Sequence, residues 1–408
     1  MTCKLWNKNF TIITLGSVVS LCGNALSGFA ISLLVLNYTG STFLYALFMM
    51  AYNLPKLVMP LLAGPYIDNF PRAKVIYTLD FTSAGLYLLI WYLLHQSFFV
   101  FWAFLAAALI IGSIDSVYQV AYDSLYPTLV PTDRYAKAYA VSSALYPLAA
   151  VMLPVAAWVY GRWGFEPLFI ANAASFFVAA CFETQIRAPE LQLEHKDENA
   201  GLAYLRHEFR AGFAYLKRET GLLFITSYFF VTMMAGNAAM TLYLPWFQSG
   251  GGPGYQMYSY FMAANVLGRF VGGAAQYKIK YPTARKFAIA FCVYVTLSVV
   301  DGSVLYLPIT VMTVVSFFEG VLGVTSYNIR ISTTQSYVPN DYRGRFNGVF
   351  QMVTFGGSIV GQLVSGALAE TLPIRAVISG FMVLNFIAVF AIMLPGRKYV
   401  KGIYNRDV

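Results

Sequence analysis

Long runs of apolar residues alternate with short polar connections along almost the whole chain. A helix needs roughly 20 apolar residues to cross the hydrocarbon core of a bilayer, and these runs reach that length. Because backbone groups in lipid must find partners within their own segment, the runs predict transmembrane α-helices. They are too long and too uniformly apolar for the short alternating strands of a membrane barrel. The twelve predicted spans are 10–36, 43–67, 75–94, 98–122, 138–160, 165–185, 221–247, 255–277, 285–305, 308–332, 346–370 and 374–394.

Composition agrees with this pattern. Hydrophobic residues make up 58% of the 408 positions and charged residues 11%, with a mean hydropathy of +0.61. Soluble domains carry about 25% charged residues, so a soluble globular protein is excluded. The first apolar run is too long for a cleavable signal peptide. The four cysteines are scattered, and their spacing predicts neither a disulfide framework nor a metal site.

Basic residues gather on one side of the predicted helices. With twelve spans, both termini and the even-numbered connections share a side, and that side holds 22 of the 27 Lys and Arg residues. The opposite side holds only Arg162 and Arg375. The positive-inside rule therefore places both termini in the cytoplasm of a multi-pass protein of the cell membrane. The net charge of +9 reflects this topology and contact with anionic membrane lipids, and no nucleic-acid partner is expected.

Two internal repeats divide the chain into halves. "VPTDRYAKAYAV" (130–141) returns as "VPNDYRGRFNGV" (338–349), and the tripeptide Gly-Asn-Ala at 23–25 returns at 236–238. Parallel halves of this kind are one of the known transporter plans. The predicted domains are an N-terminal six-helix bundle (1–186), a cytoplasmic linker with an amphipathic helix (187–220), and a C-terminal six-helix bundle with a short basic tail (221–408).

Polar and ionisable residues in the middle of spans are candidates for function, because burying them in lipid costs several kcal/mol. Glu319 is the best single candidate for a coupling or substrate-binding carboxylate; the alternative is a static pair with Lys56 or Arg269. Asn24 and Asn237, near the middle of the first helix of each half, either line a shared cavity or bond to a neighbouring helix. The predicted cavity residues are Asn24, Lys56, Asp115, Asn237, Arg269 and Glu319.

The stretch "GPYIDNFPRAKV" (64–75), between the second and third spans, resembles the signature loop of the major facilitator superfamily, with Gly64, Asp68 and Arg72 at four-residue intervals. With the arrangement of six plus six spans, the resemblance covers almost the whole chain. It implies an all-α integral membrane protein of 12 transmembrane helices in two pseudo-symmetric six-helix bundles. It also implies a cavity lined by helices 1, 4, 7 and 10, and a lock formed by Asp68 and Arg72.

Within the superfamily, "LPKLVMPLLAGPYID" and the two "VP" repeats are similar to the macrolide-efflux-like drug exporters. Three further residues lie near the cytoplasmic ends of predicted helices. Asp123 and Arg330 are candidates for a gate or for structural bonds to adjacent turns, and Asp80 is expected to bond to the signature loop.

The predicted function is secondary active transport. A small amphipathic organic molecule would be exported by alternating access, and the expected coupling ion is a proton. The chain has no GxxxxGK[ST] loop, HExxH motif or GxSxG elbow, so neither enzymatic activity nor a cofactor is expected. A monomer is expected. Two alternatives stay open: a lipid or lysolipid flippase, and a non-transporting receptor on the same fold.

Overall fold

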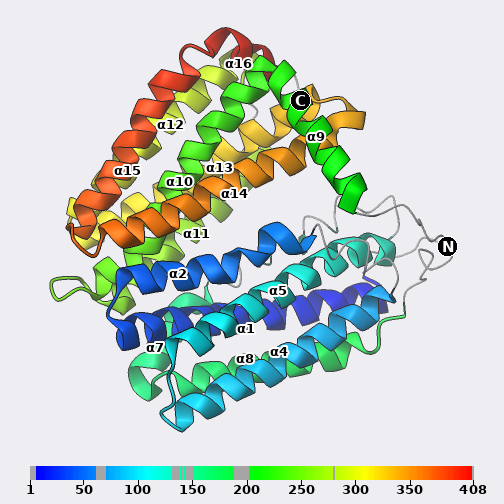
Figure 1. Cartoon of the computed structure of the whole chain (residues 1–408), viewed down its shortest axis with the longest axis vertical. Coiled ribbons are helices and arrows are strands. Elements are labelled where there is room, and N and C mark those ends of the chain that lie inside the picture. The colour runs from blue at the N-terminus through cyan, green and yellow to red at the C-terminus, as the bar shows by residue number, and fades with distance from the viewer. Residues whose placement is uncertain are drawn as a thin grey trace. The chain divides into compact units, whose positions relative to one another are not determined.

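The structure is a computed structural model that describes residues 6–60, 70–130, 138, 141–142, 145, 151–187, 202–278 and 281–406 (Figure 1). These residues form helices, turns and connections, and no strand occurs among them. Two compact units are present. Unit 1 comprises Met1–Gly40 and Phe48–Gly201, and unit 2 comprises Ser41–Leu47 and Leu202–Val408.

In unit 1, the last described helix, α8 (Glu166–Glu183), packs against both α1 (Lys8–Thr39) and α4 (Arg72–His95). Asn7 caps the first helix by accepting a hydrogen bond from the Phe10 backbone N–H, and Gly40 ends it in the left-handed conformation. The described helices are α1 (Lys8–Thr39), α2 (Thr42–Asn53), α4 (Arg72–His95), α5 (Phe101–Leu125), η1 (Tyr126–Leu129), α7 (Met152–Trp163) and α8 (Glu166–Glu183).

Unit 2 is built around two closely packed helix pairs, α10 with α14 and α11 with α13. Its described helices are α9 (Leu202–Arg218), α10 (Thr220–Gln248), α11 (Tyr255–Lys278), η4 (Thr283–Arg285), α12 (Lys286–Ser303), η5 (Val304–Tyr306), α13 (Ile309–Tyr337), α14 (Asn340–Leu368), α15 (Ile374–Ala388), η6 (Val389–Met393) and α16 (Arg397–Tyr404).

Ten helices in the described part of the chain are long and apolar enough to cross a membrane. They correspond to every predicted span except the fifth and the eighth. A 24-residue helix, α11, occupies the position of the eighth span. Nine of the 23 residues of the fifth span (138–160) lie outside the described ones, and its continuous described part is in α7. The predicted all-α membrane architecture is confirmed.

Glycines set the distance between the paired helices of unit 2. A Cβ atom added at Gly268 of α11 would lie 1.9 Å from the Phe317 carbonyl oxygen of α13, and one at Gly361 of α14 would lie 2.0 Å from the Met234 carbonyl oxygen of α10. Neither position admits a larger residue without separating the backbones. Membrane helices associate through such contacts because lipid supplies no hydrophobic force between them.

One buried asparagine in each unit bonds helices together. Asn172 of α8 is fully buried and donates to the Ser27 hydroxyl of α1 at 2.6 Å. Asn385 of α15 donates to the Ser298 hydroxyl of α12 at 2.9 Å and accepts from Thr232 of α10. The two asparagines are 213 residues apart, which is also the offset between the two Gly-Asn-Ala tripeptides. The internal repeat therefore extends to interhelical bonding.

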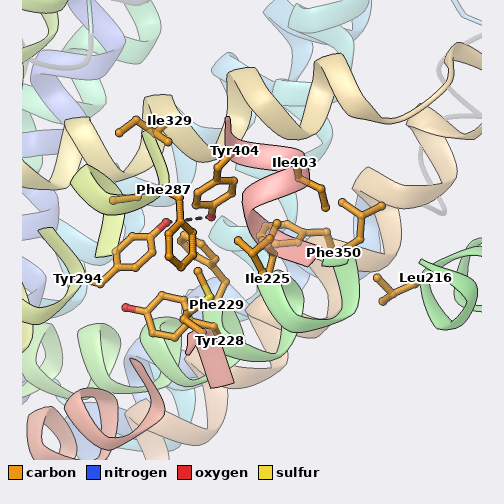
Figure 2. Close-up of a cluster of buried hydrophobic side chains, with 14 of the residues drawn as sticks. Leu216, Ile225, Tyr228, Phe229, Phe287, Tyr294, Ile329, Phe350, Ile403 and Tyr404 are labelled. Carbon is orange, nitrogen blue, oxygen red and sulfur yellow. Dashed lines mark hydrogen bonds between the residues drawn. The ribbon is translucent and has the colours of Figure 1, made fainter. Parts of the chain in front are cut away.

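The linker helix and the C-terminal helix both pack onto unit 2. Leu216 of α9 is 3% exposed, and Tyr215 stacks on Tyr342 of α14 with ring centroids 4.6 Å apart. The basic segment after the last predicted span forms α16, and its Ile403 and Tyr404 enter a cluster of buried side chains (Figure 2). The Tyr404 hydroxyl lies 2.9 Å from that of Tyr294, as the dashed line in Figure 2 shows.

Unit 2 also includes the beginning of α2. One carboxylate oxygen of Glu370, just after α14, accepts hydrogen bonds from the Phe43 backbone N–H at 2.8 Å and from the Ser41 hydroxyl at 2.7 Å. Glu370 thereby satisfies an N–H group at a helix N-terminus, where a negative charge is also favoured. The Phe43 N–H, followed by the Ser41 hydroxyl, holds the pKa of Glu370 below its usual range.

The packing of α16 predicts an ordered series of stabilities. Tyr404→Ala should lower the free energy of unfolding by about 3–5 kcal/mol, because it empties a fully buried site. Tyr404→Phe should cost only about 1 kcal/mol, because it removes one hydrogen bond. Tyr399→Ala on the same helix is the matched control, since Tyr399 is 52% exposed. Melting temperatures of the purified variants in one detergent test this order; equal melting of the two alanine variants would contradict it.

Candidate functional site

A tyrosine connects two of the predicted cavity residues in unit 1. The Tyr52 hydroxyl donates a hydrogen bond of 2.6 Å to the Asp115 carboxylate, and the Lys56 ammonium lies 4.1 Å from the centre of the Tyr52 ring. Lys56 forms no ion pair in the described part of the chain. Gly112 of α5 permits this arrangement, because a Cβ atom there would lie 2.1 Å from the Tyr52 carbonyl oxygen. The Tyr52 side chain thus contacts both the Lys56 ammonium, through its ring, and the Asp115 carboxylate, through its hydroxyl.

Two carboxyl groups meet in unit 2. Glu319 of α13 is 6% exposed, and its side chain faces Asp301 of α12 within hydrogen-bonding reach. No described donor reaches the Glu319 Oε1 atom. Two adjacent carboxylates cannot both ionise at low cost. The Asp301–Glu319 pair is therefore a candidate proton-binding site within the helix bundle of unit 2.

The Glu319–Arg269 ion pair, which was one of the two static alternatives, does not form. Arg269 instead donates from Nε to the Asn265 side-chain oxygen at 3.0 Å, although its charge still acts on Asp301. Gly320 next to Glu319 brings α13 against α11, since a Cβ atom there would lie 2.1 Å from the Asn265 carbonyl oxygen. The alternative Glu319–Lys56 pair would join the two units and stays a prediction.

The repeated Gly-Asn-Ala tripeptides have different surroundings. A Cβ atom at Gly23 would lie 2.0 Å from the Ser175 hydroxyl, so α1 and α8 approach closely there. Gly236, in contrast, has open space around its Cβ position. Asn237 donates to the Ser358 hydroxyl of α14 at 3.0 Å, which is the interhelical bond of the structural alternative. Asn24 is half-buried on α1.

The predicted gating residues are only partly described. Gly64 and Asp68 lie outside the described residues, so the lock formed by Asp68 and Arg72 stays a prediction. Arg72 begins α4 and donates to the Ser124 carbonyl oxygen at 3.2 Å. Asp123 is exposed and accepts a hydrogen bond from Gln119.

Aromatic rings surround the guanidinium group of Arg330, instead of the bonds to adjacent turns that were the structural expectation. Its guanidinium carbon lies 4.6 Å from the Phe350 ring centre, 5.1 Å from that of Phe229 and 5.3 Å from that of Tyr327. Such cation–π contacts stabilise a half-buried cation. The geometry describes a structural anchor at this end of α13.

Two acidic partners escaped the sequence analysis. Asp301 lies in the ninth predicted span but was not among the candidate residues, yet it is the neighbour of Glu319. The expected bond of Asp80 to the signature loop stays a prediction, because residues 64–69 of that loop lie outside the described residues; Asp80 is 1% exposed and faces Glu183 at the end of α8. A spacing signal was available for the helix pairs: glycines four residues apart, at 268 and 272 and at 357 and 361, favour close helix contact.

Taken together, the described residues define a polytopic membrane protein with ionisable groups held inside its helix bundles. Such groups mark substrate and ion pathways in membrane transporters. Comparison with known proteins agrees: the family model of the Major Facilitator Superfamily matches residues 13–361. The chain belongs to this superfamily, as its resemblance to the superfamily implied.

Curated relatives are distant. An uncharacterized MFS-type transporter, YkuC of Bacillus subtilis (strain 168), is 24% identical over 55% of this chain and 53% of its own length. Macrolide efflux protein A of Streptococcus pyogenes is 24% identical over 59% of this chain and 57% of its own length. These matches span just over half the length of each relative.

Among solved structures, the nucleoside transporter NupG has a similar fold. Its TM-score is 0.71 at 16% identity, covering 95% of this chain and 99% of that one. At this identity the likeness concerns the fold alone.

The glycine contacts beside the carboxyl pair predict a selective effect. Gly268→Ala should separate α11 from α13, which carry Arg269 and Glu319, and so lower the melting temperature by several degrees. Gly273→Ala on the same helix is the control, because its only near neighbour is a Val324 methyl group at 3.9 Å. Thermal unfolding of both variants measures the difference. If Gly268→Ala melts like Gly273→Ala, glycine does not set this helix spacing.

Proposed function

We propose that the protein is a proton-driven antiporter that exports a small amphipathic organic molecule across the cell membrane. The observation that carries this proposal is the Asp301–Glu319 pair, two carboxyl groups in contact within the helix bundle of unit 2. A proton carrier must alternate between a charged and a neutral state during transport. When two acids lie in contact with Arg269 close by, the states of the pair with and without the proton have comparable free energies.

The substrate class is argued from the lining residues and from a relative. Both signs of charge and many aromatic rings occur at mid-span, including the Lys56–Tyr52–Asp115 arrangement. Such a lining suits an amphipathic molecule, and macrolide export by the similar Streptococcus pyogenes protein makes macrolides the first compounds to test. The proposed path residues are Asn24, Lys56 and Asp115 of unit 1 and Asn237, Arg269 and Glu319 of unit 2.

The proposed topology has both termini in the cytoplasm, two six-helix domains (1–186 and 221–408) and a cytoplasmic linker (187–220). The protein is proposed to act as a monomer surrounded by lipid. Inward movement of protons would then drive outward movement of the substrate through alternating access, with Asp68, Arg72, Asp123 and Arg330 at the cytoplasmic side.

Single cysteines test this orientation. In a chain without its native cysteines, Gly251→Cys should react with an impermeant thiol reagent added outside intact cells, because Gly251 lies in the exposed loop between α10 and α11. Asn199→Cys in the linker should react only after the cells are opened. Labelling of intact cells followed by mass measurement reads out both sites, and the reverse pattern would overturn the orientation.

Neutral variants of Glu319 test the coupling. Everted membrane vesicles carrying a proton gradient should lose part of that gradient when a macrolide antibiotic is added, as a pH-sensitive dye reports. Glu319→Gln should abolish this response, because glutamine keeps the shape and a hydrogen-bond donor but cannot release a proton. Binding of the macrolide, measured as a shift in melting temperature, should survive.

Glu166→Gln is the matched control, since Glu166 is a half-exposed acid at the beginning of α8. It should respond to the macrolide like the unmodified protein. A normal response by Glu319→Gln would exclude Glu319 from coupling. If no macrolide shifts the melting temperature of the unmodified protein, macrolides are not its substrates, and the same screen is extended to other drugs, metabolites and lysolipids.

A further inference from the structure

A second pair of acids lies in unit 1. Asp80, in the first half of α4, and Glu183, the last residue of α8, are 1% and 0% exposed. Their carboxyl groups face each other within hydrogen-bonding reach. No described donor reaches Asp80 Oδ2 or Glu183 Oε2. Neither acid forms an ion pair in the part of the chain that the structure describes.

The described surroundings of the two acids are polar, and no cation occurs among the groups that act on them. Tyr118 of α5 donates from its hydroxyl to Glu183 Oε1 at 3.3 Å. The Ser20 hydroxyl of α1, itself 6% exposed, faces Asp80 and has no other hydrogen-bond partner among the described residues. Gly16 of α1 leaves room for the carboxyl group, since a Cβ atom there would lie 3.0 Å from Glu183 Oε1.

The remaining titratable groups near the pair do not neutralise it. Tyr122 stacks on Tyr118, with ring centroids 6.1 Å apart, and contributes no positive charge. Asp115 of α5 adds a further negative charge at longer range. A buried polar group without a partner is costly, and two buried carboxylates in contact are more so. A single proton removes both costs, because a protonated acid donates its O–H to the remaining carboxylate.

We infer that Asp80 and Glu183 form a proton-binding site in unit 1, separate from the Asp301–Glu319 pair. One proton binds to a carboxylate oxygen of the pair and is hydrogen-bonded to the other acid. Ser20 and Tyr118 supply hydroxyl groups that adjust when the proton leaves. The route to solvent is short, because Glu183 is followed directly by the exposed residues Thr184 and Gln185.

Infrared difference spectroscopy of the full chain in lipid tests this site without any substrate. A protonated carboxyl group has a C=O stretching band that shifts in heavy water, whereas a carboxylate lacks it. The unmodified protein should show such a band at neutral pH. The double variant Asp80→Asn/Glu183→Gln should lose the part contributed by this pair, and its two amides can still hydrogen-bond to each other. Glu166→Gln, on the same helix α8, should keep the band unchanged.

The variant Asp301→Asn/Glu319→Gln separates this inference from the proposed function. It should leave the contribution of the Asp80–Glu183 pair in place, whether or not it abolishes transport. An unchanged band in Asp80→Asn/Glu183→Gln would overturn the inference. Loss of the band when sodium replaces choline at constant pH would also overturn it, because the site would then bind sodium.

A measurement of stability covers the case in which the double variant folds poorly. In the unmodified protein, raising the pH removes the shared proton and leaves two anions in contact, so the melting temperature should fall. In the single variant Glu183→Gln only one acid remains, and this fall should be smaller. Equal dependence of melting temperature on pH in the two proteins would contradict a proton shared by Asp80 and Glu183.

Discussion

Close contact between helix backbones is the constraint on which the rest of this structure depends. Apolar side chains gain little free energy when they move from lipid into a contact between helices. Membrane helices therefore associate where their backbones can approach closely or where side chains can hydrogen-bond. Gly112, Gly268 and Gly320 each bring a backbone within reach of a neighbouring carbonyl group. The ionisable residues lie beside these contacts: Asp115 follows Gly112, Arg269 follows Gly268, and Glu319 precedes Gly320. Helix spacing therefore also decides which charged groups meet.

The two units share a framework but not their chemistry. Asn172 and Asn385 stand at equivalent positions of the repeat, and each is hydrogen-bonded to the first helix of its half, α1 and α10. The acid pairs are arranged differently. Asp80 lies in the first half of α4, the third helix of its half, whereas Asp301 lies near the end of α12, the corresponding helix. The two acid pairs therefore occupy different positions along the corresponding helices. An internal duplication thus carries the same interhelical asparagine in both units but differently placed acid pairs.

The sequence predicted the helices well because a membrane span is a local property of about 20 residues. It also predicted Glu319 as a functional candidate, because the position of a residue along its span is a local property as well. It did not predict that Asp301 is the neighbour of Glu319, or that Glu183 faces Asp80, because each contact joins separate helices. Such pairing depends on helix rotation and packing, which a hydropathy pattern does not encode. The interhelical glycine spacing was readable, but it specifies closeness without specifying the partner.

The burial of α16 has a consequence for biosynthesis. Val400, Ile403 and Tyr404 belong to the same cluster of side chains as Ile225 of α10, although most of the unit separates them in the sequence. Unit 2 therefore cannot complete its packing until residues 397–404 have left the ribosome. Insertion of the last predicted span is therefore not sufficient to complete this cluster, because residues C-terminal to that span supply part of it.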